Sequence, residues 1–212
     1  MLFLSLGSKD NTDSQGVSGS YNPPKEEVVD QERTLSSGSR SPYCSTVWEE
    51  NSIVLLTPNS ESVHYTLKNN PTFYFYARKH SSIALNFDLV NLEDKSGDPL
   101  YSKKIVVRQP NIIEVNLPSQ INLANDVTYI WQISVPCEED TSKTAKVVRA
   151  TVKKPGRIEK KFLSSLSRAT SDTKRAKILA ENGYWYDAIA LAKVSSIEYF
   201  QQLLHEAKIN LS

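Results

Sequence analysis

The sequence has no long apolar run and none of the short motifs that mark common catalytic sites. A transmembrane helix needs about 18 or more consecutive apolar residues, and no segment approaches that length. A G-x-S-x-G nucleophile elbow, a P-loop, a G-x-G-x-x-G dinucleotide motif and an H-E-x-x-H zinc motif are all absent. The sequence therefore predicts a protein that is not an enzyme, with no catalytic residues and no cofactor.

Histidine is scarce, and the three that are present lack the spacing of metal ligands. His64, His80 and His205 are expected in a loop, a turn at a strand end and a terminal helix, whereas zinc sites use closely spaced ligand pairs. The acidic run Glu138-Glu139-Asp140 could bind calcium, but calcium loops also need backbone carbonyl ligands and another acidic residue. A solvated acidic turn is therefore favoured over a calcium site. No metal site is predicted.

Only two cysteines are present. Cys44 precedes the first predicted strand and Cys137 follows the predicted strand Val127–Val135, and two strand ends can lie side by side in a sandwich. We predict a Cys44–Cys137 disulfide, which would close a loop of about 93 residues, and with it an oxidising compartment. The alternative is two buried free thiols in a cytosolic protein.

Charge is nearly balanced over the whole chain, at +1, but one stretch is strongly basic. Between Lys143 and Lys177 there are twelve Lys or Arg and two acidic residues. Nucleic-acid surfaces interleave aromatic with basic residues, and Phe162 is the one aromatic residue here, so no nucleic-acid partner is predicted. The basic surface is expected to meet a protein, with acidic polysaccharide, anionic lipid or mere solvation as alternatives. Its candidate binding residues are Lys153, Lys154, Lys160 and Lys161.

Residues 1–42 are predicted to be a disordered arm or the remnant of a leader. Ser8–Ser41 is rich in Ser, Gly, Asn, Asp, Gln and Pro, and such a segment cannot bury enough apolar surface to order itself. The apolar start Met1–Leu6 is shorter than a signal-peptide core and lacks a basic lead-in. It is either the stump of a secretion signal that starts upstream or an ordinary apolar terminus. Because the predicted disulfide implies an oxidising compartment, we expect a periplasmic or secreted protein whose signal peptide is incomplete or missing in this sequence.

Residues 43–154 are predicted to form an immunoglobulin-like β-sandwich of about seven strands, because short β-branched and aromatic runs alternate with turn residues. Val127–Val135 alternates most clearly, and its odd-numbered residues form one buried face. In the last strand, Thr151 is expected to face outward. The predicted strands are Ile53–Thr57, Thr72–Arg78, Ile83–Asp94, Leu100–Arg108, Asn111–Leu117, Val127–Val135 and Ala145–Lys153.

Residues 155–212 are predicted to form a short helical tail. After Pro155-Gly156 the apolar spacing becomes helical, Ser171 is a plausible N-cap, and Gly183 ends a helix. The tight glycine turn between helices resembles a tetratricopeptide-like hairpin. A single hairpin is fewer than the roughly three repeats that stand alone, so the tail must pack on the sandwich or on a partner.

Two aromatic groups are candidate binding residues. Alternation along Thr72–Arg78 places the two phenylalanines on one face and Tyr74 and Tyr76 on the other. Exposed tyrosines would stack sugars, which gives the alternative function of a polysaccharide-binding accessory protein; otherwise they cover the second face of the sheet. Trp185 belongs either to the hairpin core or, if exposed, to an interaction surface.

Five blocks of sequence, spread over about residues 38–212, together resemble one protein family. They are Gly38-Ser-Arg40 followed by Cys44, Leu55-Leu-Thr-Pro-Asn-Ser60, Asn70-Pro-Thr-Phe-Tyr-Phe-Tyr76, Thr128-Tyr-Ile-Trp131 with Val135-Pro-Cys-Glu-Glu139, and Glu181-Asn-Gly-Tyr-Trp-Tyr-Asp-Ala188. This combination resembles the cyanobacterial domain of unknown function 928. The resemblance implies a secreted or periplasmic protein that retains the paired cysteines, and it implies no activity.

The leading hypothesis is a non-catalytic, extracytoplasmic binding or scaffolding module. It would engage a protein partner through the helical tail and the basic surface. The oligomeric state is not predicted.

Overall fold

In a computed structural model of the chain, the described residues are 20–25, 52–58, 62–78, 82–137, 140 and 144–211. They are mainly β, and all seven predicted strands and the helical tail are present within a few residues of the expected bounds. The strands are β1 Ile53–Leu55, β2 Thr72–Ala77, β3 Ile83–Asn91, β4 Pro99–Val107, β5 Asn111–Asn116, β6 Thr128–Pro136 and β7 Thr144–Lys153. The helices are α2 Lys160–Arg168, α3 Asp172–Glu181, α4 Trp185–Ser195 and α5 Ile197–Glu206.

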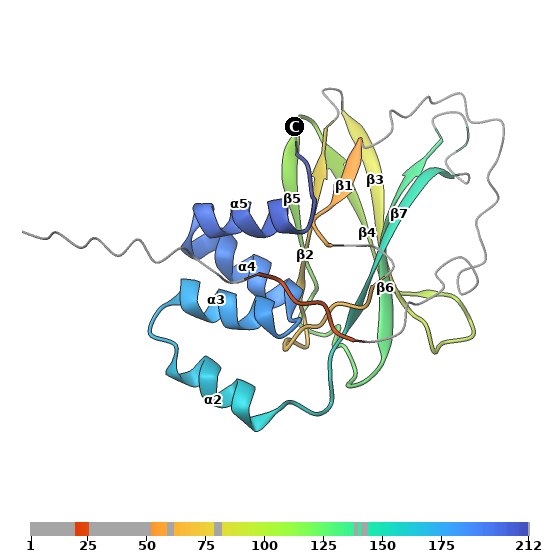
Figure 1. Cartoon of the computed structure of the whole chain (residues 1–212). Helices are drawn as coiled ribbons and strands as arrows, with labels where there is room; N and C mark the ends of the chain where they lie inside the picture. The colour runs from red at the N-terminus through yellow and green to blue at the C-terminus, as the bar shows by residue number, and fades with distance from the viewer. Residues whose placement is uncertain are drawn as a thin grey trace, which may run out of the picture.

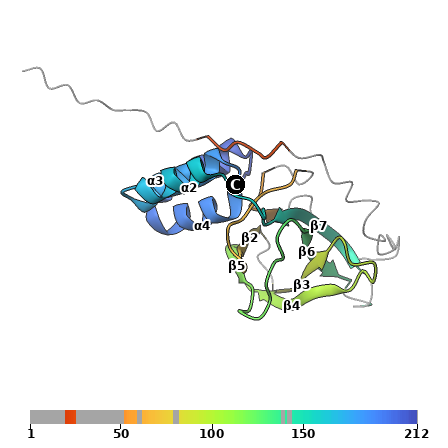
Figure 2. The ribbon, with the colours of Figure 1, turned by 90° about the horizontal axis from the view of Figure 1, so that it is seen from below.

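The strands form two antiparallel sheets. One has three strands in the order β1-β2-β5, and the other has four in the order β4-β3-β6-β7. In the smaller sheet Phe73 lies opposite Val115 and Tyr74 opposite Glu114, so the phenylalanines share one face and the tyrosines the other, as predicted. Figure 2, seen from below, shows the two sheets facing each other.

The inner faces of the two sheets share one core. The ring centroid of Phe73 in β2 lies 5.5 Å from that of Phe87 in β3 and 5.1 Å from that of Trp131 in β6. The alternating residues of β6 from Tyr129 to Val135 are all buried, which confirms the predicted buried face. At the start of β6, the Tyr129 hydroxyl accepts a hydrogen bond from the Ala124 amide, five residues upstream, at 3.0 Å.

The outer face of β7 is covered by the chain before β2. Thr151 is fully buried, and its hydroxyl donates to the carbonyl of Ser62 at 2.6 Å. The Thr66 amide donates to the carbonyl of Lys153, and the Lys153 amide donates to the carbonyl of His64. Thr151 thus alternates with the core residues Ala150 and Val152, as predicted, but its outward face is buried and not open to solvent. Alternation identifies the two faces of a strand but not a segment that packs over one of them.

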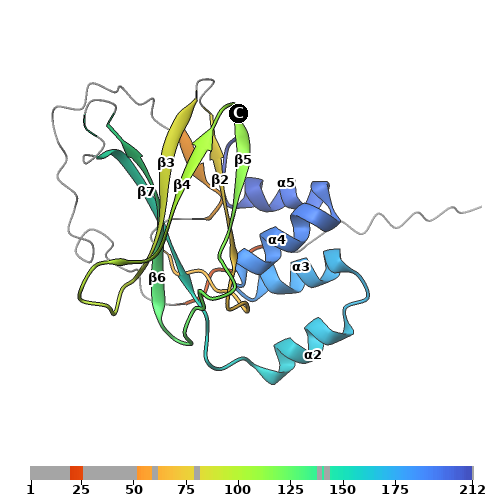
Figure 3. The ribbon, with the colours of Figure 1, turned by 180° about the vertical axis from the view of Figure 1, so that it is seen from behind.

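The four described helices lie on one side of the sheets, next to the three-stranded sheet (Figures 1 and 3). The Ser171 hydroxyl accepts from the Lys174 amide at 3.2 Å, which confirms the predicted N-cap of α3. Gly183 ends the same helix with φ +83°, a conformation that favours glycine. Among the described residues, no helix is long and apolar enough to cross a membrane.

Residues 20–25 pack against the helices and form the red segment in Figure 1. The Tyr21 ring lies 4.9 Å from that of Trp185, between centroids. The prediction of disorder for residues 1–42 does not hold for this part, because Tyr21 and Pro24 contact the helical region and the Asn22 amide hydrogen-bonds the end of α3. The rest of the predicted arm lies outside the described residues.

Candidate functional site

The first turn of α4 is inserted into the core of the sheets. Trp185 is fully buried, and its indole N–H donates to the carbonyl of Leu56 at 2.8 Å. The Tyr186 hydroxyl accepts from the Trp131 indole N–H at 2.8 Å and donates to the carbonyl of Thr151 at 2.6 Å. Trp185 is thus not an exposed interaction residue: it belongs to the core, and together with Tyr186 it fixes α4 relative to both sheets.

A groove of about 510 Å³ lies between the three-stranded sheet and the helices. Its volume is within the range of protein pockets that bind small molecules, roughly 300 to 1,000 Å³. Most of its lining is apolar, with a few polar groups among the aliphatic side chains. The lining residues are Leu67, Lys68, Thr72 and Tyr74 on the sheet side, Leu166 of α2, Arg175 and Leu179 of α3, and Asp187, Ala190, Leu191 and Val194 of α4.

Exposed aliphatic side chains are found at the groove and at the start of α5. Val194, which lines the groove, is 77% exposed, and Ile197 at the start of α5 is 62% exposed. Leu166 and Leu191 inside the groove are half-buried. Exposed aliphatic side chains that adjoin an apolar groove are typical of a surface that a partner covers.

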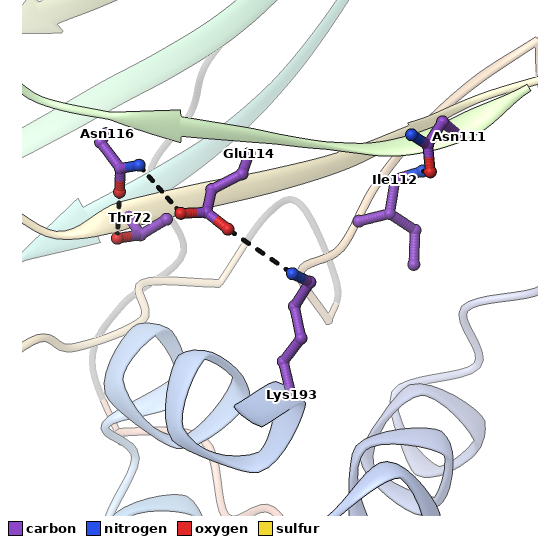
Figure 4. Close-up of polar contacts among 6 residues, drawn as sticks. All are labelled: Thr72, Asn111, Ile112, Glu114, Asn116 and Lys193. Atoms are coloured by element: carbon purple, nitrogen blue, oxygen red, sulfur yellow. Dashed lines mark hydrogen bonds and ion pairs between the residues drawn. The ribbon is translucent and has the colours of Figure 1, made fainter. Parts of the chain in front are cut away.

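A polar network beside the groove joins α4 to the sheet (Figure 4). The Thr72 hydroxyl donates to Asn116 Oδ1 at 2.7 Å, and Asn116 Nδ2 donates to Glu114 Oε1 at 2.8 Å. Lys193 Nζ lies 3.5 Å from Glu114 Oε2 and 5.4 Å from the ring centroid of Tyr74. The side chains of Lys193 and Glu114 are both about a third or more exposed, so their ion pair adds little stability. The ion pair instead holds Lys193 over the sheet, where the lysine flanks the groove.

The tyrosines of β2 do not form an exposed platform for sugars. Tyr74 is 5% exposed, and burial together with the adjacent Glu114 carboxylate raises its pKa to about 12. Tyr76 is half-buried and packs against the core. The stacking prediction is wrong because the helices lie over this face of the sheet, and the alternative in which Tyr74 and Tyr76 cover the second face is confirmed.

The charged groups of the groove differ in their environments. Lys68 and Arg175 are exposed, and Arg175 Nη1 lies 2.9 Å from Asp172 Oδ1. Asp187 is buried, and its Oδ2 accepts from the Leu67 amide at 2.7 Å. Burial raises the pKa of Asp187, while that hydrogen bond acts to lower it. The groove thus presents aliphatic surface with two cations at its rim, an arrangement that favours an apolar ligand with acidic flanks.

The four lysines predicted as a basic binding surface lie outside the groove. Lys153 and Lys154 are half-buried at the end of β7, and Lys154 Nζ donates to Asn69 Oδ1 at 2.5 Å. Lys160 and Lys161 are exposed in the first turn of α2. From the basic stretch 143–177, it is Arg175 that reaches the groove.

Sequence reasoning missed the residues of α4 that line the groove. A signal was present, because the segment from Trp185 to Ser195 is apolar around most of its circumference, and a helix of that kind is contacted on more than one side. Ala188 and Ala192 face the interior, whereas Leu191 and Val194 project into the groove.

Two predictions depend on residues outside the described part of the chain. Cys137 is buried just after β6, but its predicted partner Cys44 is not described, so the disulfide stays a prediction. His80, Glu138 and Glu139 are likewise not described. Within the described ranges, no group of three or more His, Cys, Asp or Glu side chains is placed to hold a metal ion.

In the described part of the chain, two antiparallel sheets of seven strands, with four helices packed on one side, define a mainly β protein with an apolar groove. Its sequence matches the Domain of Unknown Function DUF928 over residues 35–210. The chain belongs to this family, and the resemblance predicted from the sequence blocks is confirmed. No curated protein matches the chain.

Two solved structures show a weak likeness. A cycloisomaltooligosaccharide glucanotransferase from Paenibacillus sp., in complex with cycloisomaltoheptaose, is 12% identical with a TM-score of 0.32, over 57% of this chain and 19% of that one. A family 76 glycoside hydrolase from a bovine Bacteroides thetaiotaomicron strain is 11% identical with a TM-score of 0.30, over 68% and 36%. This chain spans about a fifth and about a third of those proteins, and the likeness supports no conclusion about function.

Proposed function

We propose that this protein is a non-catalytic binding module that holds a protein partner in the groove between the three-stranded sheet and the helices. The observation that carries the proposal is the continuous apolar surface from Leu166 and Leu191 to the exposed Val194. The cations Lys68 and Arg175 at the rim favour a partner segment with aliphatic side chains between acidic residues. The proposal keeps the helical tail as part of the partner-binding surface, but its basic residues are Lys68 and Arg175 and not the four lysines predicted from the sequence.

The proposed fold is an immunoglobulin-like sandwich with a tetratricopeptide-like hairpin. If the seven strands are lettered A, B, C, C′, E, F and G, the two sheets have the orders A-B-E and C′-C-F-G, which agrees with the immunoglobulin arrangement. Tyr129 also resembles the tyrosine corner of such domains, since its hydroxyl bonds the backbone at Ala124. The pair α3 and α4, joined through Gly183, supports the hairpin.

Selection from a random library identifies a partner segment directly. A phage-displayed library of random peptides of about 12 residues, panned on the full chain, should enrich peptides that combine aliphatic and acidic residues. The Val194→Asp variant should bind the enriched synthetic peptide at least about 10-fold more weakly in fluorescence anisotropy. The reason is that a buried valine contributes about 1.5 kcal/mol or more, and the new carboxylate repels acidic flanks.

Leu163→Asp is the matched control, because Leu163 is 43% exposed on α2 and does not line the groove. This variant should bind the peptide as the unmodified chain does. Failure to enrich any common motif, or equal affinity for the Val194→Asp variant, would contradict the proposed site.

The proposed compartment is periplasmic or secreted, and the proposed Cys44–Cys137 disulfide is its chemical signature. Protein purified without reductant and unfolded in guanidinium should show no thiol that reacts with Ellman's reagent, and two after reduction. The reduced sample of the same protein is the control for reagent access. Two reactive thiols before reduction would exclude the disulfide and remove the physical support for an oxidising compartment.

A further inference from the structure

A second binding feature lies where residues 20–25 cross the helices (Figure 1). Their contacts are with residues distant in the sequence: the chain near His64 and the helices α3, α4 and α5. The segment is extended, without helix or strand of its own. It therefore sits on the folded chain as a short bound peptide would.

The side chain of Tyr21 packs against the rings of His64 and Trp185. Its ring meets that of Trp185 edge to face, at 4.9 Å between centroids and 74° between planes. Its hydroxyl lies 2.6 Å from Nδ1 of His64, a side chain that is fully buried. Edge-to-face aromatic pairs add to the gain from burial, and the partly buried hydroxyl has a polar partner. These contacts select an aromatic side chain with a polar tip.

The peptide backbone is held at the end of α3. The Asn22 amide donates to the carbonyl of Ala180 at 3.1 Å, and Asn22 Nδ2 donates to the carbonyl of Glu181 at 3.2 Å. Carbonyl groups in the last turn of a helix lack intrahelical partners and accept such bonds. The Tyr21 amide donates to Glu206 Oε2 of α5 at 3.3 Å. Backbone recognition of this kind fixes an extended segment in one register.

Gly183 makes room for the proline that follows. A Cβ atom at this position would lie 2.9 Å from Cγ of Pro24 and 3.3 Å from the carbonyl oxygen of Asn22. Glycine at this turn therefore serves both the positive φ and the close approach of the segment. Pro23, between these contacts, is exposed.

We propose that Trp185, His64, the end of α3 and Gly183 form a peptide-binding cleft for an extended Tyr-x-x-Pro segment, which this chain fills with its own residues Tyr21–Pro24. The cleft is distinct from the apolar groove, whose lining includes none of His64, Ala180, Glu181, Gly183 and Trp185. Because the bound segment is part of the same chain, its effective concentration is in the millimolar range of tethered ligands. The same sequence supplied as a separate peptide has to compete with it.

Competition gives a direct test on the full chain. The probe is a fluorescein-labelled peptide of residues 18–27, Ser-Gly-Ser-Tyr-Asn-Pro-Pro-Lys-Glu-Glu, titrated by fluorescence anisotropy. The double variant Tyr21→Ala/Pro24→Ala should bind the peptide at least about 10-fold more tightly than the unmodified chain, because its own segment no longer fills the cleft. Pro23→Ala is the matched control and should behave as the unmodified chain does.

Absence of saturable binding to the double variant, or equal affinity for both proteins, would overturn the proposal. So would undiminished binding of a probe peptide in which the tyrosine is alanine. A second measurement covers the case in which the double variant fails to fold. In the unmodified chain, hydrogen exchange at the Asn22 amide should be at least about 10-fold slower than in the free peptide, and exchange at the free-peptide rate would refute the docked segment.

Discussion

Replacement of Trp185 with alanine is expected to lower the free energy of unfolding by about 3 to 5 kcal/mol, the range for truncation of a large buried aromatic side chain. The indole is fully buried, fills the junction between α4 and the sheets, and supports the ring of Tyr21. Its removal also leaves the carbonyl of Leu56 without the 2.8 Å bond from the indole N–H. Cavity formation and a lost buried hydrogen bond therefore act together.

Thermal unfolding followed by circular dichroism measures this change. For a chain of this size a loss of 1 kcal/mol lowers the melting temperature by roughly 2 to 4 °C, so a decrease of about 6 to 20 °C is expected. Val194→Ala, in the same helix but 77% exposed, should change stability by no more than about 0.5 kcal/mol. Equal melting temperatures for Trp185→Ala and Val194→Ala would contradict the buried junction.

The same experiment reports whether helices and sheets unfold together. One contiguous core contains Phe73 and Trp131 of the sheets and Trp185, Tyr186 and Leu203 of the helices. A cooperative core of this kind predicts a single transition for the β and helical signals. The sequence predicts a boundary between the sandwich and the helical tail at residues 154 and 155. With a single transition, that boundary marks only the place where the chain leaves the sheets, and both parts unfold as one unit.

The strands could be predicted because their pattern is local. In β6, alternation from Tyr129 to Val135 reflects one buried face, and the period is visible in nine residues of sequence. The cap at Ser171 and the stop at Gly183 are likewise local, since the first depends on one hydroxyl and the second on the positive φ of one residue. Such features do not depend on what lies across the fold.

What covers a face could not be predicted, because it depends on distant segments. Tyr74 has the same sequence context whether α4 lies over it or solvent does, and Thr151 is buried by residues almost ninety positions earlier. Tyr21 lies in a polar segment whose composition predicts disorder, yet its partners His64 and Trp185 are supplied by the loop and helix that the fold brings together. The groove also depends on distant segments, because one wall comes from β2 and the chain just before it and the other from three helices.

Replacement of Tyr186 with phenylalanine is expected to lower the free energy of unfolding by about 2 to 4 kcal/mol, although one oxygen atom is all that is lost. The hydroxyl accepts from the Trp131 indole N–H and donates to the carbonyl of Thr151, so it joins β6, α4 and β7 in the interior. An unsatisfied buried polar group costs about 1 to 3 kcal/mol, and this substitution leaves a donor and an acceptor without that partner. The ring itself remains in place, 5.4 Å from that of Phe73.

Urea unfolding of the Tyr186→Phe variant, with the slope of the transition unchanged, isolates the effect of the hydroxyl. Tyr76→Phe is the matched control, because Tyr76 lies on the half-buried outer face of β2 and its hydroxyl joins no such pair of interior groups among the described contacts. The control should change stability by no more than about 0.5 kcal/mol. If both variants lost the same free energy of unfolding, the hydrogen bonds of Tyr186 would not be what holds α4 against β6 and β7. The position of α4, on which both the groove and the peptide cleft depend, would then need a different explanation.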